Sequence, residues 1–219
     1  MQTKPKICIV FNAGAAGDFL VTLLTHQQLK TGEFLIINEL GTVSSASGHS
    51  FKKACREFYE SNFDPSVFSH CEMDPIVNTH FYYQELNKLF PECRFYYIDD
   101  SKFQHITINA YIKKRVVPHY SNLLRWLQSA KHIPFAHKIK YLSDEQIIKI
   151  MTRDWKRNTT QWADHGLPPI NFSDIVSKEK CRILIENVLQ CSIHEEIFST
   201  SHNMWSSKNK EIIEKVNDV

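Results

Sequence analysis

The sequence predicts an α/β protein in which a mostly parallel central sheet is flanked by helices. Short apolar runs rich in β-branched and aromatic residues alternate along the chain with segments of helical periodicity. The first run, Ile7–Phe11, is apolar throughout, as expected of a strand buried on both faces, and a glycine-containing loop connects it to a helix. Apolar residues form 42% of the sequence, enough for a substantial core, so we expect a single domain over residues 1–219.

The predicted strands are short apolar or aromatic runs bounded by turn-forming residues. We expect Ile7–Phe11 to be an interior parallel strand, because a continuously apolar strand must be covered on both faces. The other predicted strands are Phe34–Ile37, Asp74–Thr79, Arg94–Ile98 and Pro168–Phe172.

Helices are predicted where apolar residues recur at helical spacing and where stop signals such as Pro91 follow. A Ser/Gly-rich stretch, Gly41–Ser50, is predicted to be a surface loop. Trp155 and Trp162 fall on one helical face and are predicted to lie in the core. The predicted helices are Phe19–Leu29, Phe51–Glu60, Tyr82–Phe90, Phe103–Lys114, Ser121–Ala130, Asp144–Trp162, Lys178–Leu189 and Asn209–Val216.

Charge and cysteine spacing disfavour several classes of protein. The net charge is +2 and the basic runs Lys113–Arg115 and Lys138–Lys140 are short, so nucleic acid is not an expected partner. The six cysteines form no CxxC pair, which argues against a disulfide framework or a zinc site. No apolar stretch reaches the ~18 residues that a membrane span needs, and no secretory segment precedes the first strand. We therefore expect a cytoplasmic protein with no membrane partner.

The loop after the first strand is the segment with the clearest chemistry. Its small residues let the backbone turn sharply and expose N–H groups, and the helix that follows adds the positive end of its dipole. Together these features predict a site for an anion such as a nucleotide phosphate. The alternative is a tight strand–helix turn that binds nothing, with Asp18 capping the helix. The loop residues are Asn12, Ala13, Gly14, Ala15, Ala16, Gly17 and Asp18.

Several segments in order resemble the cytosolic sulfotransferases, whose α/β fold is P-loop-like. Phe19-Leu20 matches the Trp-Leu that ends the family's phosphosulfate-binding loop, and Asn78-Thr79-His80 matches its Lys-Thr-His. The segment 95–102 is similar to the strand and Arg-Asn-Pro segment that hold the donor's 3′-phosphate. Further along, 169–175 and the helix Cys181–Leu189 resemble the family's Tyr-Glu-Asp-Leu strand and final helix.

The resemblance implies a divergent sulfotransferase of this fold. Such a protein moves a sulfuryl group from 3′-phosphoadenosine 5′-phosphosulfate to the hydroxyl of an acceptor. It also implies that His80 is the general base and that the loop 12–18 holds the donor. Lys102 and Asn109 are then the candidates for the remaining contacts to the donor.

The sequence departs from the family at two charged positions. Gly14 stands where the family has its phosphosulfate lysine, and Asp100 stands where it has an arginine. Sulfuryl transfer needs positive charge where negative charge develops, so another cation must substitute. Lys102 is the closest candidate in sequence, and the run Lys113–Arg115 follows on the next predicted helix.

Two other functions remain open from the sequence. Asp99 or Asp100 could hold magnesium in a metal-dependent nucleotide phosphotransferase. A binding or regulatory protein that kept the fold and lost the chemistry would also fit, because the lysine and the arginine are missing. His80 itself could be a strand-end residue that bonds to nearby backbone. His105 is a weaker site candidate near Asp99. Eight other histidines are expected to be solvated: His49, His70, His119, His132, His137, His165, His194 and His202.

Overall fold

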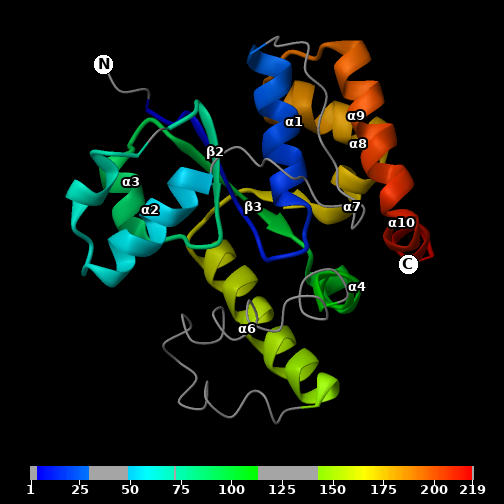
Figure 1. Ribbon diagram of the computed structural model, residues 1–219, viewed down its shortest axis with the longest axis horizontal. Helices are drawn as coiled ribbons and strands as arrows, with labels where there is room; N and C mark the ends of the chain where they lie inside the picture. The colour runs from blue at the N-terminus through cyan, green and yellow to red at the C-terminus, as the bar shows by residue number, and fades with distance from the viewer. Residues whose placement is uncertain (1–3, 30–48, 72, 113–142, 219) are drawn as a thin grey trace.

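A computed structural model describes residues 4–29, 49–71, 73–112 and 143–218 of the chain (Figure 1). In chain order the elements are β1 (Ile7–Val10), α1 (Gly17–Leu29), α2 (His49–Glu60), the 3₁₀ turn η1 (Pro65–Phe68), β2 (Ile76–Thr79), α3 (Gln84–Leu89), β3 (Arg94–Asp99), the 3₁₀ turn η2 (Ser101–Phe103), α4 (Gln104–Tyr111), α6 (Asp144–Asp164), β4 (Pro169–Asn171), α7 (Phe172–Val176), α8 (Lys178–Ile183), the π-helical turn η5 (Leu184–Val188), α9 (Glu195–Lys208) and α10 (Lys210–Asn217).

The described strands form one parallel sheet in the order β2-β1-β3-β4. β1 is an interior strand with all its residues buried, which confirms the prediction for the first apolar run. Its last residue, Val10, lies opposite Thr79 of β2 and Tyr97 of β3. The carboxyl ends of β1 and β2 therefore meet at the same edge of the sheet, where open α/β sheets bind their ligands.

Helices cover both faces of the sheet, as the alternation of strands and helices predicts. α1 lies with α8, α9 and α10 on one side, whereas α2 and α3 lie on the other (Figure 1). Side chains alternate along β1 accordingly: Ile7 and Ile9 join the core under α1, and Cys8 and Val10 join the core under α2. All six cysteines are free and buried.

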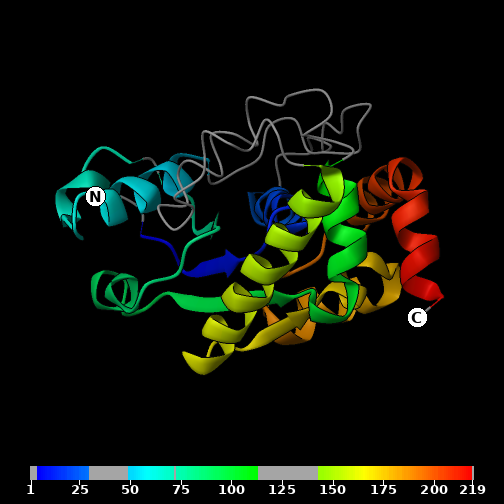
Figure 2. The same cartoon turned by 90° about the horizontal axis from the view of Figure 1, so that it is seen from below.

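α6 lies across the strands, and α4 packs beside it (Figure 2). A capping box starts α6: the Ser143 hydroxyl accepts from the Gln146 N–H, and the Gln146 side chain accepts from the Ser143 N–H. Trp155 packs in the small core between α4 and α6, and Trp162 joins the core under α2. Both tryptophans are thus core residues, as predicted.

The structure differs from the sequence prediction mainly in the C-terminal third. The predicted strand Phe34–Ile37, the helix Ser121–Ala130 and most of the loop Gly41–Ser50 lie outside the described residues. The helix α9 was not predicted, because its Ser, Thr, His and Asn residues have low helix propensity. It forms because Phe198 and Trp205 bury their side chains in the core under α1. Within the described ranges, no helix is both long and apolar enough to cross a membrane.

Candidate functional site

The loop between β1 and α1 has the backbone geometry of an anion-binding turn. Gly14 and Ala16 have positive φ values of 90° and 58°, and the residues around them have negative φ. Such alternation turns successive N–H groups toward one concave side. Within the described ranges, the N–H groups of Gly14, Ala16 and Gly17 donate no hydrogen bond to the protein. The loop can therefore offer these donors to an oxyanion at the N-terminus of α1.

Both glycines of the loop are also required by packing. A Cβ on Gly14 would lie 2.6 Å from the Thr107 carbonyl oxygen, and a Cβ on Gly17 would lie 2.2 Å from the Phe11 ring. The loop is thus held between α4 and the Phe11 ring. Substituting either glycine would disturb the fold, so a glycine variant cannot by itself report on ligand binding.

The side chain of Asn12 fastens the loop to the core. Its Nδ2 donates to Asp100 Oδ1 at 3.1 Å and to Thr159 Oγ1 at 3.2 Å. Its Oδ1 accepts from Asn158 Nδ2 at 3.3 Å. Because Asn12 is buried and its amide is used in this way, its part in holding a ligand is limited to its backbone. The network joins the residues that follow β1 and β3 to α6.

Asp100 belongs to the same buried network. Its Oδ2 accepts from Thr107 Oγ1 at 2.9 Å, while its Oδ1 accepts from Asn12. Burial raises the pKa of Asp100 to about 6, although the hydrogen bonds from Asn12 and Thr107 lower it in part. Asp100 therefore anchors the loop through Asn12.

This raised pKa makes a prediction about stability and pH. Between about pH 4 and 6 the folded protein keeps a proton on Asp100 that the unfolded chain releases. The contribution of this proton to the free energy of unfolding is fully present below the pKa that Asp100 has in the unfolded chain. It is lost as the pH rises through about 6, which lowers the free energy of unfolding by up to about 3 kcal/mol. Urea unfolding at pH 4.5 and 7 should show this loss in wild type relative to Asp100→Asn. Asp99→Asn is the control, and an equal pH dependence in wild type and Asp100→Asn would contradict the prediction.

Asp99, the last residue of β3, and Asp100 are both engaged in hydrogen bonds within the protein. Asp99 Oδ1 accepts from the Ser101 N–H at 3.0 Å, and both oxygens of Asp100 accept from side chains inside the protein. Among the described residues, no group of three His, Cys, Asp or Glu side chains could hold a metal ion. The geometry therefore gives no support to a magnesium-dependent transferase that uses Asp99 or Asp100.

His80 lies directly beside the start of the loop. Its Nδ1 is 2.8 Å from the carbonyl oxygen of Phe11, and the two rings pack at 4.5 Å between centroids. A carbonyl only accepts, so Nδ1 carries the proton and the neutral ring has its lone pair on Nε2. This is the tautomer that a general base acting through Nε2 requires. The same hydrogen bond is also what a purely structural strand-end histidine would make.

A charged cluster that the sequence did not reveal lies beside the Phe11 ring, on which His80 also packs. Lys52 Nζ is 2.6 Å from Asp18 Oδ1, and Asn78 Nδ2 donates to the same oxygen at 2.9 Å. Lys52 Nζ also lies 5.8 Å from the centroid of the Phe11 ring. The cluster joins α1, α2 and β2, the edge strand of the described sheet, at the end that carries the loop. In sequence, Lys52 is one of two adjacent lysines on an amphipathic helix and looks like a solvated residue.

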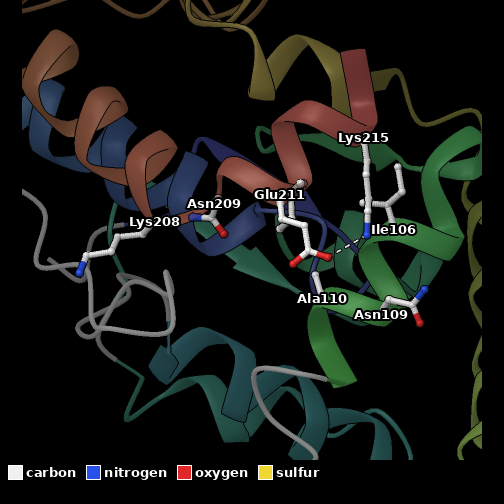
Figure 3. A pocket seen from close by; sticks show the side chains of 8 residues that line it. Ile106, Asn109, Ala110, Lys208, Asn209, Glu211 and Lys215 are labelled. Atoms are coloured by element: carbon white, nitrogen blue, oxygen red, sulfur yellow. Dashed lines mark hydrogen bonds and ion pairs between the residues drawn. The ribbon is translucent and has the colours of Figure 1, made fainter. Parts of the chain in front are cut away.

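The structure does not bring Lys102 and Asn109 to the loop. Lys102 is exposed on η2. On α4, Thr107 and Tyr111 face Gly14, and helical geometry puts Asn109 on the opposite side. Asn109 instead lines a hollow of about 90 Å³ between α4 and the junction of α9 and α10. Figure 3 shows Asn109 there with the Glu211–Lys215 ion pair.

The sequence analysis also named the run Lys113–Arg115 and two histidines, His105 and His202. The run Lys113–Arg115 lies outside the described residues, and His105 is exposed on α4. The prediction that His202 is solvated is wrong: it is 2% exposed, with Nε2 3.1 Å from the Ile175 carbonyl oxygen and Nδ1 3.1 Å from Ser206 Oγ. Burial lowers the pKa of His202, so this histidine is a neutral core residue. The error follows from missing α9.

The fold and the loop define an α/β protein whose described strands form a four-stranded parallel sheet flanked by helices. A comparison of the chain with protein-family models, with curated proteins and with solved structures finds no match.

Proposed function

We propose that this protein binds the phosphosulfate group of 3′-phosphoadenosine 5′-phosphosulfate at the loop 12–18 and transfers the sulfuryl group to an acceptor hydroxyl. The observation that carries the proposal is the position of His80. Its ring is hydrogen-bonded to the carbonyl of Phe11, the residue immediately before a loop in which the N–H groups of Gly14, Ala16 and Gly17 have no acceptor among the described residues. A base and an oxyanion site are thus adjacent at the carboxyl end of the sheet.

The residues present suit one part of this donor. Three unpaired N–H donors in the described loop, at Gly14, Ala16 and Gly17, and the N-terminus of α1 suit a phosphosulfate. Lys102 and Asn109 do not face the loop, so they are not assigned to the 3′-phosphate. When bound, the donor supplies an activated sulfuryl group whose acceptor is a nucleophilic oxygen.

The protein's own part is to position the groups and to move one proton. The loop N–H groups stabilise negative charge that develops on the donor's oxygens, and they need no reorganisation to do so. His80 Nε2 accepts the proton of the acceptor hydroxyl while Nδ1 stays bonded to Phe11, which fixes the orientation of the ring. The Asn12–Asp100 network keeps the loop in place.

Titration calorimetry with 3′-phosphoadenosine 5′-phosphate tests the binding step. We expect a dissociation constant on the order of micromolar, and at least tenfold weaker binding of adenosine 3′-monophosphate, which lacks the 5′-phosphate. Addition of EDTA should leave the affinity unchanged, whereas a magnesium-dependent site would lose it. If wild type binds neither nucleotide, the proposal is wrong.

A binding protein without catalysis is the second candidate, and two observations favour it. Gly14 brings no cation to the loop, and Asp100 is turned inward to Asn12 and Thr107. Tight binding of 3′-phosphoadenosine 5′-phosphate without sulfuryl transfer to any of a panel of phenols, alcohols and sugars would identify this case.

A further inference from the structure

The loop 12–18 contains no basic side chain of its own. Asp18 even brings a carboxylate to the first turn of α1, close to the N–H groups that would receive an anion. Backbone donors and a helix dipole attract an oxyanion, but a nearby carboxylate opposes it. A bound phosphate or sulfate at this loop therefore needs a cation from another part of the chain.

Lys52 is the cation that the structure brings there. Its Nζ lies 2.6 Å from Asp18 Oδ1, although α2 is separated from α1 in sequence. The Lys52 side chain is 13% exposed, whereas that of its neighbour Lys53 is 78% exposed. The charge of Lys52 is thus held in a partly desolvated place where salt screens it less than a surface charge.

The other hydrogen bond of Asp18 would allow Lys52 to leave the carboxylate for an oxyanion. Asp18 Oδ1 also accepts from Asn78 Nδ2, so the carboxylate keeps a hydrogen bond when Lys52 turns away. The amide of Asn78 is completely buried, and its Oδ1 has no donor among the described residues. A buried acceptor without a donor is costly, so a donor that approaches this oxygen is stabilised.

We propose that Lys52 binds the oxyanion held by the loop, and that its ion pair with Asp18 restrains it until the oxyanion competes with the carboxylate. This inference rests on the proposed anion site and adds the residue that supplies its charge. Asp18 then acts against ligand binding, while Lys52 acts for it. The two members of one ion pair therefore have opposite effects on affinity.

The opposite effects of the two residues on ligand affinity distinguish this role of Lys52 from a purely structural one. Lys52→Met and Asp18→Asn both remove the same ion pair, so a merely structural pair would change the affinity in the same direction in both variants. We expect Lys52→Met to weaken binding of 3′-phosphoadenosine 5′-phosphate at least tenfold, and Asp18→Asn to tighten it several-fold. Lys53→Met, on the exposed neighbour, should bind as wild type does.

Calorimetry on the full chain at two salt concentrations measures the affinity of each variant for 3′-phosphoadenosine 5′-phosphate. Thermal unfolding of each variant checks that it is folded. Lys52→Arg is a second variant that keeps the charge and should retain most of the affinity. If wild type binds and Lys52→Met binds equally well, or if Asp18→Asn weakens binding as Lys52→Met does, the role of Lys52 is disproved and the anion site stands. If wild type does not bind, both the anion site and the role of Lys52 are disproved.

Discussion

His80→Asn is expected to lower the turnover of sulfuryl transfer by about 10²–10⁴-fold, the usual contribution of a general base. The asparagine Nδ2 can still donate to the Phe11 carbonyl, as Nδ1 of the imidazole does at 2.8 Å. The variant thus removes the basic nitrogen and keeps the hydrogen bond that positions the side chain. The affinity for 3′-phosphoadenosine 5′-phosphate should stay within about twofold, because a base contacts the acceptor and not the adenosine.

Single-turnover assays with a panel of phenols, alcohols and sugars measure this effect. His80→Ala is the companion variant, because it removes both the base and the hydrogen bond to Phe11, and His165→Gln is the control for a histidine elsewhere. Equal rates in wild type and His80→Asn would remove His80 from the chemistry and leave sulfuryl transfer itself standing. A loss of donor affinity as large as the loss of turnover would instead make His80 a structural support of the loop.

The sheet and the place of His80 could be predicted from the sequence for a simple reason. Ile7–Phe11 is apolar at every position, which only a strand covered on both faces tolerates, and parallel strands bring their carboxyl ends to one edge. His80 directly follows the predicted strand Asp74–Thr79, so the sequence places it at this edge, whereas the structure alone shows that this strand pairs with the first. The observed pairing of Val10 with Thr79 agrees with this reasoning.

Lys52 and Asp100 could not be placed in this way. Lys52 reaches Asp18 only because α2 packs against the edge strand β2, which is a tertiary contact that no local pattern encodes. By sequence Asp100 is a candidate magnesium ligand, but in the structure it is buried, and Asn12 and Thr107 supply the hydrogen bonds that allow its burial. Lys52 is 34 residues from Asp18 and Asp100 is 88 residues from Asn12, so residue type and spacing contain no signal for these two contacts.

Gly17→Ala is expected to lower the free energy of unfolding by about 2–4 kcal/mol, because the new Cβ would overlap the Phe11 ring at 2.2 Å. Without this overlap the substitution should be favourable. Gly17 is in the first turn of α1, its φ is not positive, and alanine is the better helix former by about 0.5–1 kcal/mol. The sign of the effect therefore reports the contact with Phe11.

A double-mutant cycle isolates that contact. Phe11→Ala alone should cost about 3–5 kcal/mol, since it removes a buried ring from the core. In that background Gly17→Ala should become neutral or stabilising, because the methyl group enters the space that the ring has left, and the coupling should reach about 2 kcal/mol or more.

Gly166→Ala is the matched control, since Gly166 has a φ of 74° and open space around its Cβ position, so only backbone strain of about 1–2 kcal/mol applies. Urea unfolding with unchanged m-values measures all of these variants. If Gly17→Ala costs the same with and without the Phe11 ring, then the glycine is not needed for the packing of Phe11, and its place in the loop must be explained by what the loop binds.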